Sequence, residues 1–80
     1  MDSIDKLLKK ISRDDRLMIE KALLLLFERK FSSLDRKKLK GFQHIYRVRT
    51  GNFRIIYFDD GSEIILKAIK KRDESTYSDF

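Results

Sequence analysis

The sequence predicts an α+β fold in which two N-terminal helices pack on one face of a three-stranded antiparallel sheet. Apolar residues recur at the helical period over residues 3–30, then alternate with polar residues over 45–70, where two short turns separate three alternating segments. At 80 residues the chain is expected to form one domain over 1–80: a helical hairpin at 3–30, a sheet at 45–70 and a polar tail at 71–80.

The first helix is expected to start at Ser3, which is a suitable N-cap. Its apolar residues fall at i, i+3, i+4 and i+7: Ile4, Leu7, Leu8 and Ile11. The second helix is expected to follow Ser12, which forms a capping box with Asp15, and to run to about Lys30. Its last two turns are apolar almost all round, so we expect cover on more than one side, from this chain or from a partner.

Three strands are predicted after a segment, Phe31–Gly41, that has no clear period. Their β-branched and aromatic residues alternate with polar ones over 45–50, 53–58 and 63–70. Gly51-Asn52 suits a two-residue type II′ hairpin turn, and Asp60-Gly61 is predicted as the second turn.

The turn at Gly51-Asn52 determines which face of the sheet each side chain of the first hairpin occupies. It pairs Thr50 with Phe53 and Arg49 with Arg54, and places Arg47 on the same face as these two arginines. The opposite face becomes the core: Tyr46, Val48, Phe53, Ile55 and Tyr57. Because like charges opposite each other repel, a sequence selected for stability alone would avoid the pairing of Arg49 with Arg54.

Extending the alternation through the second turn places Lys67 opposite Arg54, as a fourth cation on that face. It adds Ile64, Leu66 and Ala68 to the core face, and puts Ile56, Ile65 and Ile69 on the basic face. A bulge at the second turn would instead move Lys67 to the other side.

The positive charge is concentrated in the middle of the chain, whose formal net charge is +6. From Arg36 to Phe58 there are seven basic residues and no acidic one: Arg36, Lys37, Lys38, Lys40, Arg47, Arg49 and Arg54. Such a surface attracts phosphate groups, nucleic acid or an acidic protein segment. The charge pattern alone would also suit an unrelated basic nucleic-acid-binding domain.

Composition narrows the remaining function classes. Without Cys, and with His44 as the single histidine, the chain has no Cys-based zinc site, so we expect no metal and no cofactor. The longest apolar run, Ala22–Phe27, is too short to span a membrane, so we expect no membrane contact and a cytoplasmic location.

Four strings of the sequence together resemble the RelE/ParE family of toxin–antitoxin toxins. They are Lys38-Leu39-Lys40-Gly41, Ile45-Tyr46-Arg47-Val48-Arg49, Gly51-Asn52-Phe53-Arg54-Ile55-Ile56-Tyr57, and Lys70-Lys71-Arg72-Asp73 followed by Tyr77. The tail looks more like the RelE branch, which consists of ribosome-dependent mRNA endonucleases, than the ParE branch, which poisons DNA gyrase. The resemblance implies metal-free cleavage of mRNA in the ribosomal A site and inhibition by a cognate antitoxin.

The resemblance also implies roles for individual residues. Arg47 and Arg49 would grip and activate the mRNA, Arg54 would stabilise the phosphorane, and Tyr77 would stack on or orient the nucleotide. The remaining basic catalytic position falls on Lys71, with its neighbour Arg72 as the alternative. Further RNA contacts are expected from Lys37, Lys38, Lys40, Lys67 and Arg72.

The chain departs from the family pattern in two places. Two arginines, Arg47 and Arg49, stand where RelE itself carries lysines, and arginine scarcely loses its proton. The general base is therefore open among Lys71, Tyr77 and His44. In addition, the family opens with a β-strand that this sequence lacks, which would leave a sheet edge unpaired and offer a route to a dimer. A non-catalytic member, acting as a ParE-like gyrase inhibitor or as an attenuated toxin that only binds antitoxin, is the alternative.

Overall fold

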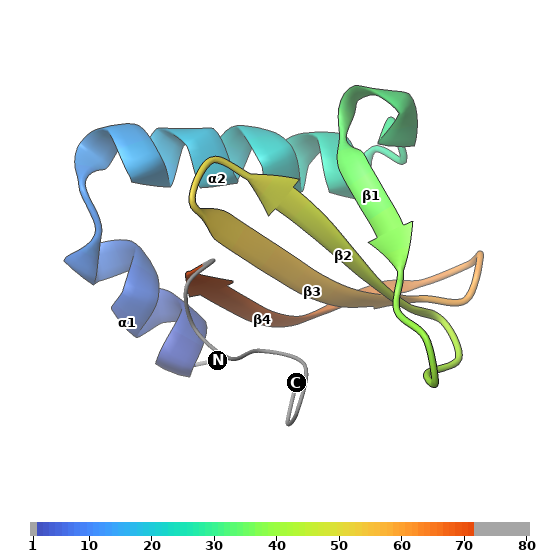
Figure 1. Cartoon of the computed structure of the whole chain (residues 1–80). Coiled ribbons are helices and arrows are strands. Elements are labelled where there is room, and N and C mark those ends of the chain that lie inside the picture. Colours follow the sequence, from blue (N-terminus) through green and yellow to red (C-terminus); the bar gives the residue numbers. More distant parts are fainter. Residues whose placement is uncertain (1, 72–80) are drawn as a thin grey trace.

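The computed structural model describes residues 2–71, with side chains from residue 6 onward, as a pair of helices followed by a sheet (Figure 1). Helix α1 spans Asp2–Lys10 and helix α2 spans Arg13–Phe27. The backbone N–H of Asp15 donates a 3.1 Å hydrogen bond to the Ser12 hydroxyl, which confirms the predicted N-cap of the second helix.

The outer limits of both helices differ from prediction. Ser3 lies inside α1 and so does not cap it. Helix α2 ends at Phe27, before Lys30, because Arg29 adopts the left-handed conformation with φ 60°. The backbone N–H groups of Arg29 and Lys30 fold back to the carbonyls of Leu26 and Leu25, at 3.0 and 2.9 Å, and close the helix end.

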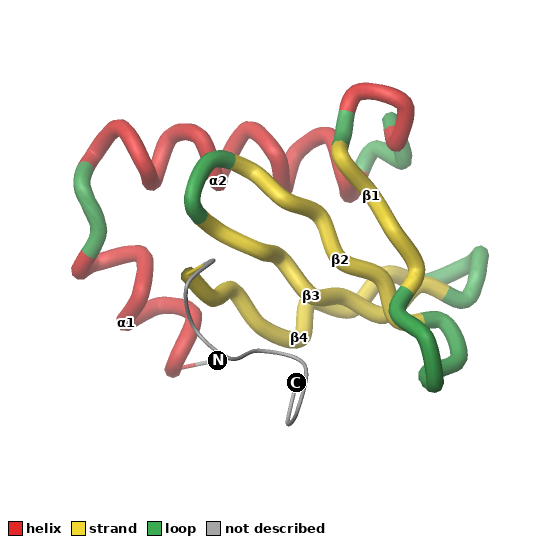
Figure 2. The backbone as a smooth tube through the Cα atoms, viewed as in Figure 1, coloured by secondary structure: helices red, strands yellow, loops and turns green. Residues whose placement is uncertain are grey.

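The sheet has four antiparallel strands in the order β1-β2-β3-β4, so the prediction of three strands was wrong (Figure 2). They are β1 (Asp35–Lys38), β2 (Ile45–Thr50), β3 (Phe53–Asp59) and β4 (Ile64–Lys71), and a 3₁₀ turn at Phe31–Ser33 precedes β1. The sheet therefore begins at residue 35 and not at 45. All four residues of β1 are charged, so no apolar alternation marks it, and it forms by pairing with β2.

The first hairpin has the predicted register. Arg49 lies opposite Arg54, and Thr50 lies opposite Phe53. Gly51 adopts φ 58°, as the first position of a type II′ turn requires, and an added Cβ there would collide with the Met18 side chain of α2.

The second hairpin differs from prediction. Asp59 pairs with Ile64 across a four-residue loop, and a bulge lies where Ile56 pairs with Ala68 but Tyr57 pairs with Leu66. Lys67 is the extra residue of this bulge, so it does not lie opposite Arg54, and Lys70 takes that position.

The bulge also exchanges two apolar residues between the faces of the sheet. Ile69, which was expected on the basic face, is 7% exposed and packs in the core, whereas Ala68 pairs with Ile56 on the other face.

Both helices lie on one face of the sheet, with α2 near β2 and α1 near β4, and the opposite face is left open (Figure 1). The core between the layers contains Ile19, Ala22, Leu26, Val48, Phe53, Ile55, Tyr57 and Ile69. None of the helices in the described part of the chain is long and apolar enough to cross a lipid bilayer.

Candidate functional site

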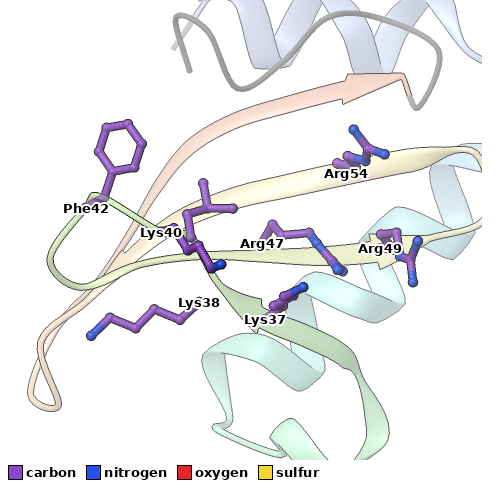
Figure 3. A pocket seen from close by; sticks show the side chains of 8 residues that line it. Lys37, Lys38, Lys40, Phe42, Arg47, Arg49 and Arg54 are labelled. Carbon is purple, nitrogen blue, oxygen red and sulfur yellow. The ribbon is translucent and has the colours of Figure 1, made fainter.

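A cleft of about 470 Å³ lies on the open face of the sheet, away from the helices (Figure 3). Six of its eight lining residues are basic. They are Lys37, Lys38, Lys40, Arg47, Arg49 and Arg54, and the other two are Leu39 and Phe42. This is a cationic surface with an aromatic ring at one end, a combination that suits a phosphate-bearing chain.

The strand register explains why these cations meet. Arg49 lies between Asp35 of β1 and Arg54 of β3, and Lys70 of β4 continues the same row across the sheet. In the next row, Lys37 lies opposite Arg47. Figure 3 shows Arg47 and Arg49 pointing the same way along β2, with Lys37 beside Arg47. Side chains two residues apart on a strand share a face, so the alternation of basic residues becomes a single patch.

One carboxylate ties two of these arginines together. Asp35 accepts a 2.9 Å hydrogen bond from Arg49 Nε, and its other carboxylate oxygen lies 3.6 Å from a terminal guanidinium nitrogen of Arg47. The hydrogen bond from Arg49 is the main reason that the pKa of Asp35 lies below its usual value. Arg47 is the most enclosed of the three, with a side chain 10% exposed, against 41% for Arg49 and 52% for Asp35.

The remaining arginine of the basic run turns to the helix face. Arg36 lies between the rings of Phe31 and Tyr46, 3.9 Å from each centroid, and its guanidinium reaches the buried Asp59 at 3.3 Å and the Tyr57 hydroxyl. Burial raises the pKa of Tyr57, although the hydrogen bond from Arg36 opposes this effect. Arg36 is therefore part of the packing of the domain and not of the cleft.

The structure brings together most of the predicted site residues, but not all of them. Six of them line the cleft: Arg47, Arg49, Arg54, Lys37, Lys38 and Lys40. Lys67 does not line it, and Lys71 pairs with the core residue Phe53 and borders a hollow at the junction of α1 and α2. His44 packs edge-on against Phe58, with ring centroids 5.7 Å apart. Arg72 and Tyr77 lie outside the described residues.

Sequence reasoning missed three residues at the site. Asp35 enters through the unpredicted strand β1, and Lys70 reaches the position beside Arg54 through the bulge in β4. Phe42, which is 40% exposed, lies in the loop between β1 and β2 and borders the cleft. The one signal available for Asp35 was its position immediately before the basic run.

The cleft can bind and stabilise negative charge. Guanidinium groups donate paired hydrogen bonds to phosphate oxygens, and clustered cations stabilise a pentacoordinate phosphorane more strongly in an enclosed site than in water. Within residues 2–71, no group of three or more acidic or histidine side chains is placed to hold a metal ion.

Comparisons with known proteins find a relative and a similar structure. No protein-family model matches the chain. Over 47 residues, or 59% of its length, the chain is 43% identical to the toxin RelE3 of Methanocaldococcus jannaschii, and it spans about half (52%) of that curated relative. Its fold matches a chain in the crystal structure of the RelB-RelE antitoxin-toxin complex from Methanococcus jannaschii with a TM-score of 0.66 and 28% identity, covering 90% of this chain and 87% of the other.

Proposed function

We propose that this chain, which is similar to RelE toxins in sequence and fold, is the toxin of a toxin–antitoxin pair and that it cleaves mRNA in the ribosomal A site without a metal ion. A ribosomal target implies a cytoplasmic location. The observation that carries the proposal is the cleft on the open sheet face, where Arg47, Arg49 and Arg54 meet three lysines.

The proposed reaction is attack of a ribose 2′-OH on the adjacent phosphate. It needs a base for the hydroxyl, an acid for the leaving oxygen and stabilisation of the charge that develops on the phosphorane. Arg47 and Arg49 would hold the scissile phosphate, and Arg54, on the neighbouring strand, would stabilise the phosphorane.

Two of the three candidate bases lie within the described residues, and both lie away from the cleft. Lys71 borders the hollow on the helix side of the sheet, and His44 packs against Phe58, so neither lines the cleft. We propose Tyr77 as the base on the strength of the resemblance, which puts this residue on the nucleotide.

The cognate antitoxin would have two surfaces to cover. One is the cationic cleft, which an acidic segment would neutralise, and the other is the outer side of α2, where Leu17, Leu24 and Phe27 are each about half exposed. An amphipathic segment with acidic residues suits both surfaces. The edge strands β1 and β4 also offer a route to a dimer.

Cleavage in a reconstituted translation system tests the enzymatic proposal. We expect wild-type protein to cut mRNA only when ribosomes are present, with primer extension locating the cuts. Arg54→Ala and Tyr77→Phe should abolish them. Glu20→Gln, an exposed change on α2 far from the cleft, should cut as the wild type does. Cuts that persist in Arg54→Ala would contradict the assignment of the cleft.

One observation favours the alternative of a non-catalytic member. The two cations of β2 are arginines paired with Asp35, and arginine, unlike lysine, is a poor general base because it scarcely gives up its proton. If folded wild-type protein leaves mRNA intact but inhibits DNA supercoiling by gyrase, a ParE-like action replaces the endonuclease. If it does neither but binds antitoxin, the chain is an attenuated toxin.

A further inference from the structure

Asp35 pairs with two arginines of the cleft that a negatively charged ligand would be expected to contact. Its carboxylate meets Arg49 Nε at 2.9 Å and a guanidinium nitrogen of Arg47 at 3.6 Å, with one oxygen facing each arginine. Both arginines line the cleft, and Asp35 comes from the edge strand β1, directly opposite Arg49. The two guanidinium groups therefore already bind an anion in the free protein.

A carboxylate and a phosphate compete for the same guanidinium donors. Both present oxygen pairs at the spacing that a planar guanidinium fork matches. The Nε of Arg49 has one N–H, and while this proton binds Asp35 it is not available to a phosphate oxygen.

The ion pair between Asp35 and Arg49 is also of a kind that costs little to break. With 52% of the Asp35 side chain and 41% of the Arg49 side chain exposed, water and salt screen their attraction, and exposed pairs of this type contribute little to folding. A polyanionic ligand that brings several phosphates can therefore displace the carboxylate from Arg49 at small cost.

We propose that Asp35 is a positioning residue that occupies the phosphate subsite formed by Arg47 and Arg49 and competes there with the backbone of bound RNA. This inference rests on the proposed function, because it requires that the cleft take RNA. In the free protein Asp35 keeps the two guanidinium groups side by side despite their like charge. On binding, it releases them to phosphate, so RNA affinity is lower than the cleft cations alone would give.

The test compares Asp35→Asn with a matched loss of one negative charge elsewhere, Glu20→Gln, which is exposed on α2. Binding of a short fluorescein-labelled single-stranded RNA is measured by anisotropy from low to physiological ionic strength. We expect Asp35→Asn to bind about tenfold more tightly than wild type, and Glu20→Gln less than about threefold more tightly. Asp35→Asn should also steepen the dependence of log affinity on log salt by about 0.7, the value for one further contact to a single strand. Asp35→Glu, which keeps the carboxylate, should return affinity toward wild type.

Each other outcome would overturn the inference. If Asp35→Asn binds no more tightly than Glu20→Gln, or more weakly than wild type, Asp35 does not compete with phosphate. If neither wild type nor Asp35→Asn binds RNA at low salt, the subsite takes no RNA phosphate, and the proposed nucleic-acid function falls with it. Tighter binding by Asp35→Asn without any mRNA cleavage would support the competition and contradict only the endonuclease.

Discussion

Two aspartates in this domain each bind a pair of arginines, and they differ in what surrounds them. Asp59 receives two bonds from Arg29, at 3.1 and 3.2 Å, and one from Arg36 at 3.3 Å, and its side chain is 4% exposed. Asp35 pairs with Arg47 and Arg49 at comparable distances, but its side chain is 52% exposed. Both clusters join one carboxylate to two guanidinium groups, but only the Asp35 carboxylate is well exposed to water.

The comparison indicates that burial separates a structural cluster from an exchangeable one. When a buried carboxylate loses its partners, no water takes their place. Breaking that cluster therefore costs much free energy of folding. An exposed carboxylate exchanges its partners for water, so breaking the cluster costs little and the arginines remain available to a ligand. Asp59, at the end of β3, joins the segment just after α2 to β1 through Arg29 and Arg36, whereas Asp35 joins β1 to β2 beside the cleft.

The largest change in the free energy of unfolding is expected from Asp59→Ala. It removes the partner of Arg29 and Arg36 and the acceptor of a 2.8 Å bond from the Gly61 N–H. Because both arginines keep some contact with water, we expect the free energy of unfolding to fall by about 2–3 kcal/mol, at or just below the range of about 3–5 kcal/mol for a broken buried pair. Urea unfolding measures this change. A loss as small as that of Asp35→Asn would contradict the comparison.

Two adjacent residues of β1 test the same contrast between structural and ligand-binding cations, with a smaller expected change in the free energy of unfolding. Arg36 and Lys37 are adjacent in β1, but Arg36 faces the aromatic rings on the helix side and Lys37 faces the cleft. We expect Arg36→Ala to lower the free energy of unfolding by about 1–2 kcal/mol, through lost cation–π contacts and hydrogen bonds, with little change in RNA affinity.

Lys37→Ala should do the reverse. Its free energy of unfolding should stay within about 0.5 kcal/mol of wild type, while RNA affinity falls and its salt dependence becomes shallower. Measuring unfolding and RNA binding on both variants gives a two-by-two comparison. If both variants lose stability, or both lose affinity, the two faces of β1 do not have separate roles.

Arg49→Ala is expected to have less effect on folding than Arg36→Ala. The side chain is 41% exposed and lies opposite the like charge of Arg54, so its removal relieves a repulsion while it breaks the pair with Asp35. We expect a change in unfolding free energy within about 0.5 kcal/mol and a clear loss of RNA affinity. Marked destabilisation would place Arg49 with the structural arginines.

The first hairpin could be predicted from the sequence because its determinants are local. A two-residue turn at Gly51-Asn52 fixes every pair between β2 and β3, so the shared face of Arg47, Arg49 and Arg54 followed from alternation alone. The three arginines that line the cleft were therefore predictable from the sequence alone.

The parts that could not be predicted depend on contacts distant in the chain. Strand β1 is a run of charged residues with no alternation, and it becomes a strand only because β2 offers it an edge. The bulge at Lys67 has no mark in the sequence, yet it shifts the rest of β4 and puts Lys70 beside Arg54. Asp35 and Asp59 acquire their opposite roles from burial, which a residue type does not encode.

The smallest expected effect is the acid dependence of the Asp35 cluster. The hydrogen bond from Arg49 holds the pKa of Asp35 below its usual value in the folded protein. The folded state therefore binds this proton less tightly than the unfolded state, so the contribution of Asp35 to stability is fully present above about pH 5 and is lost as the pH falls through the lowered pKa. Urea midpoints of wild type and Asp35→Asn, measured from neutral pH down to acid, isolate this contribution, because all other titrating groups are shared. We expect a small, constant advantage for wild type near neutral pH and none once the pH lies well below 3.8. An advantage that disappears above that pH would mean that Arg49 does not hold the carboxylate in solution, and the competition with phosphate proposed above would lose its basis.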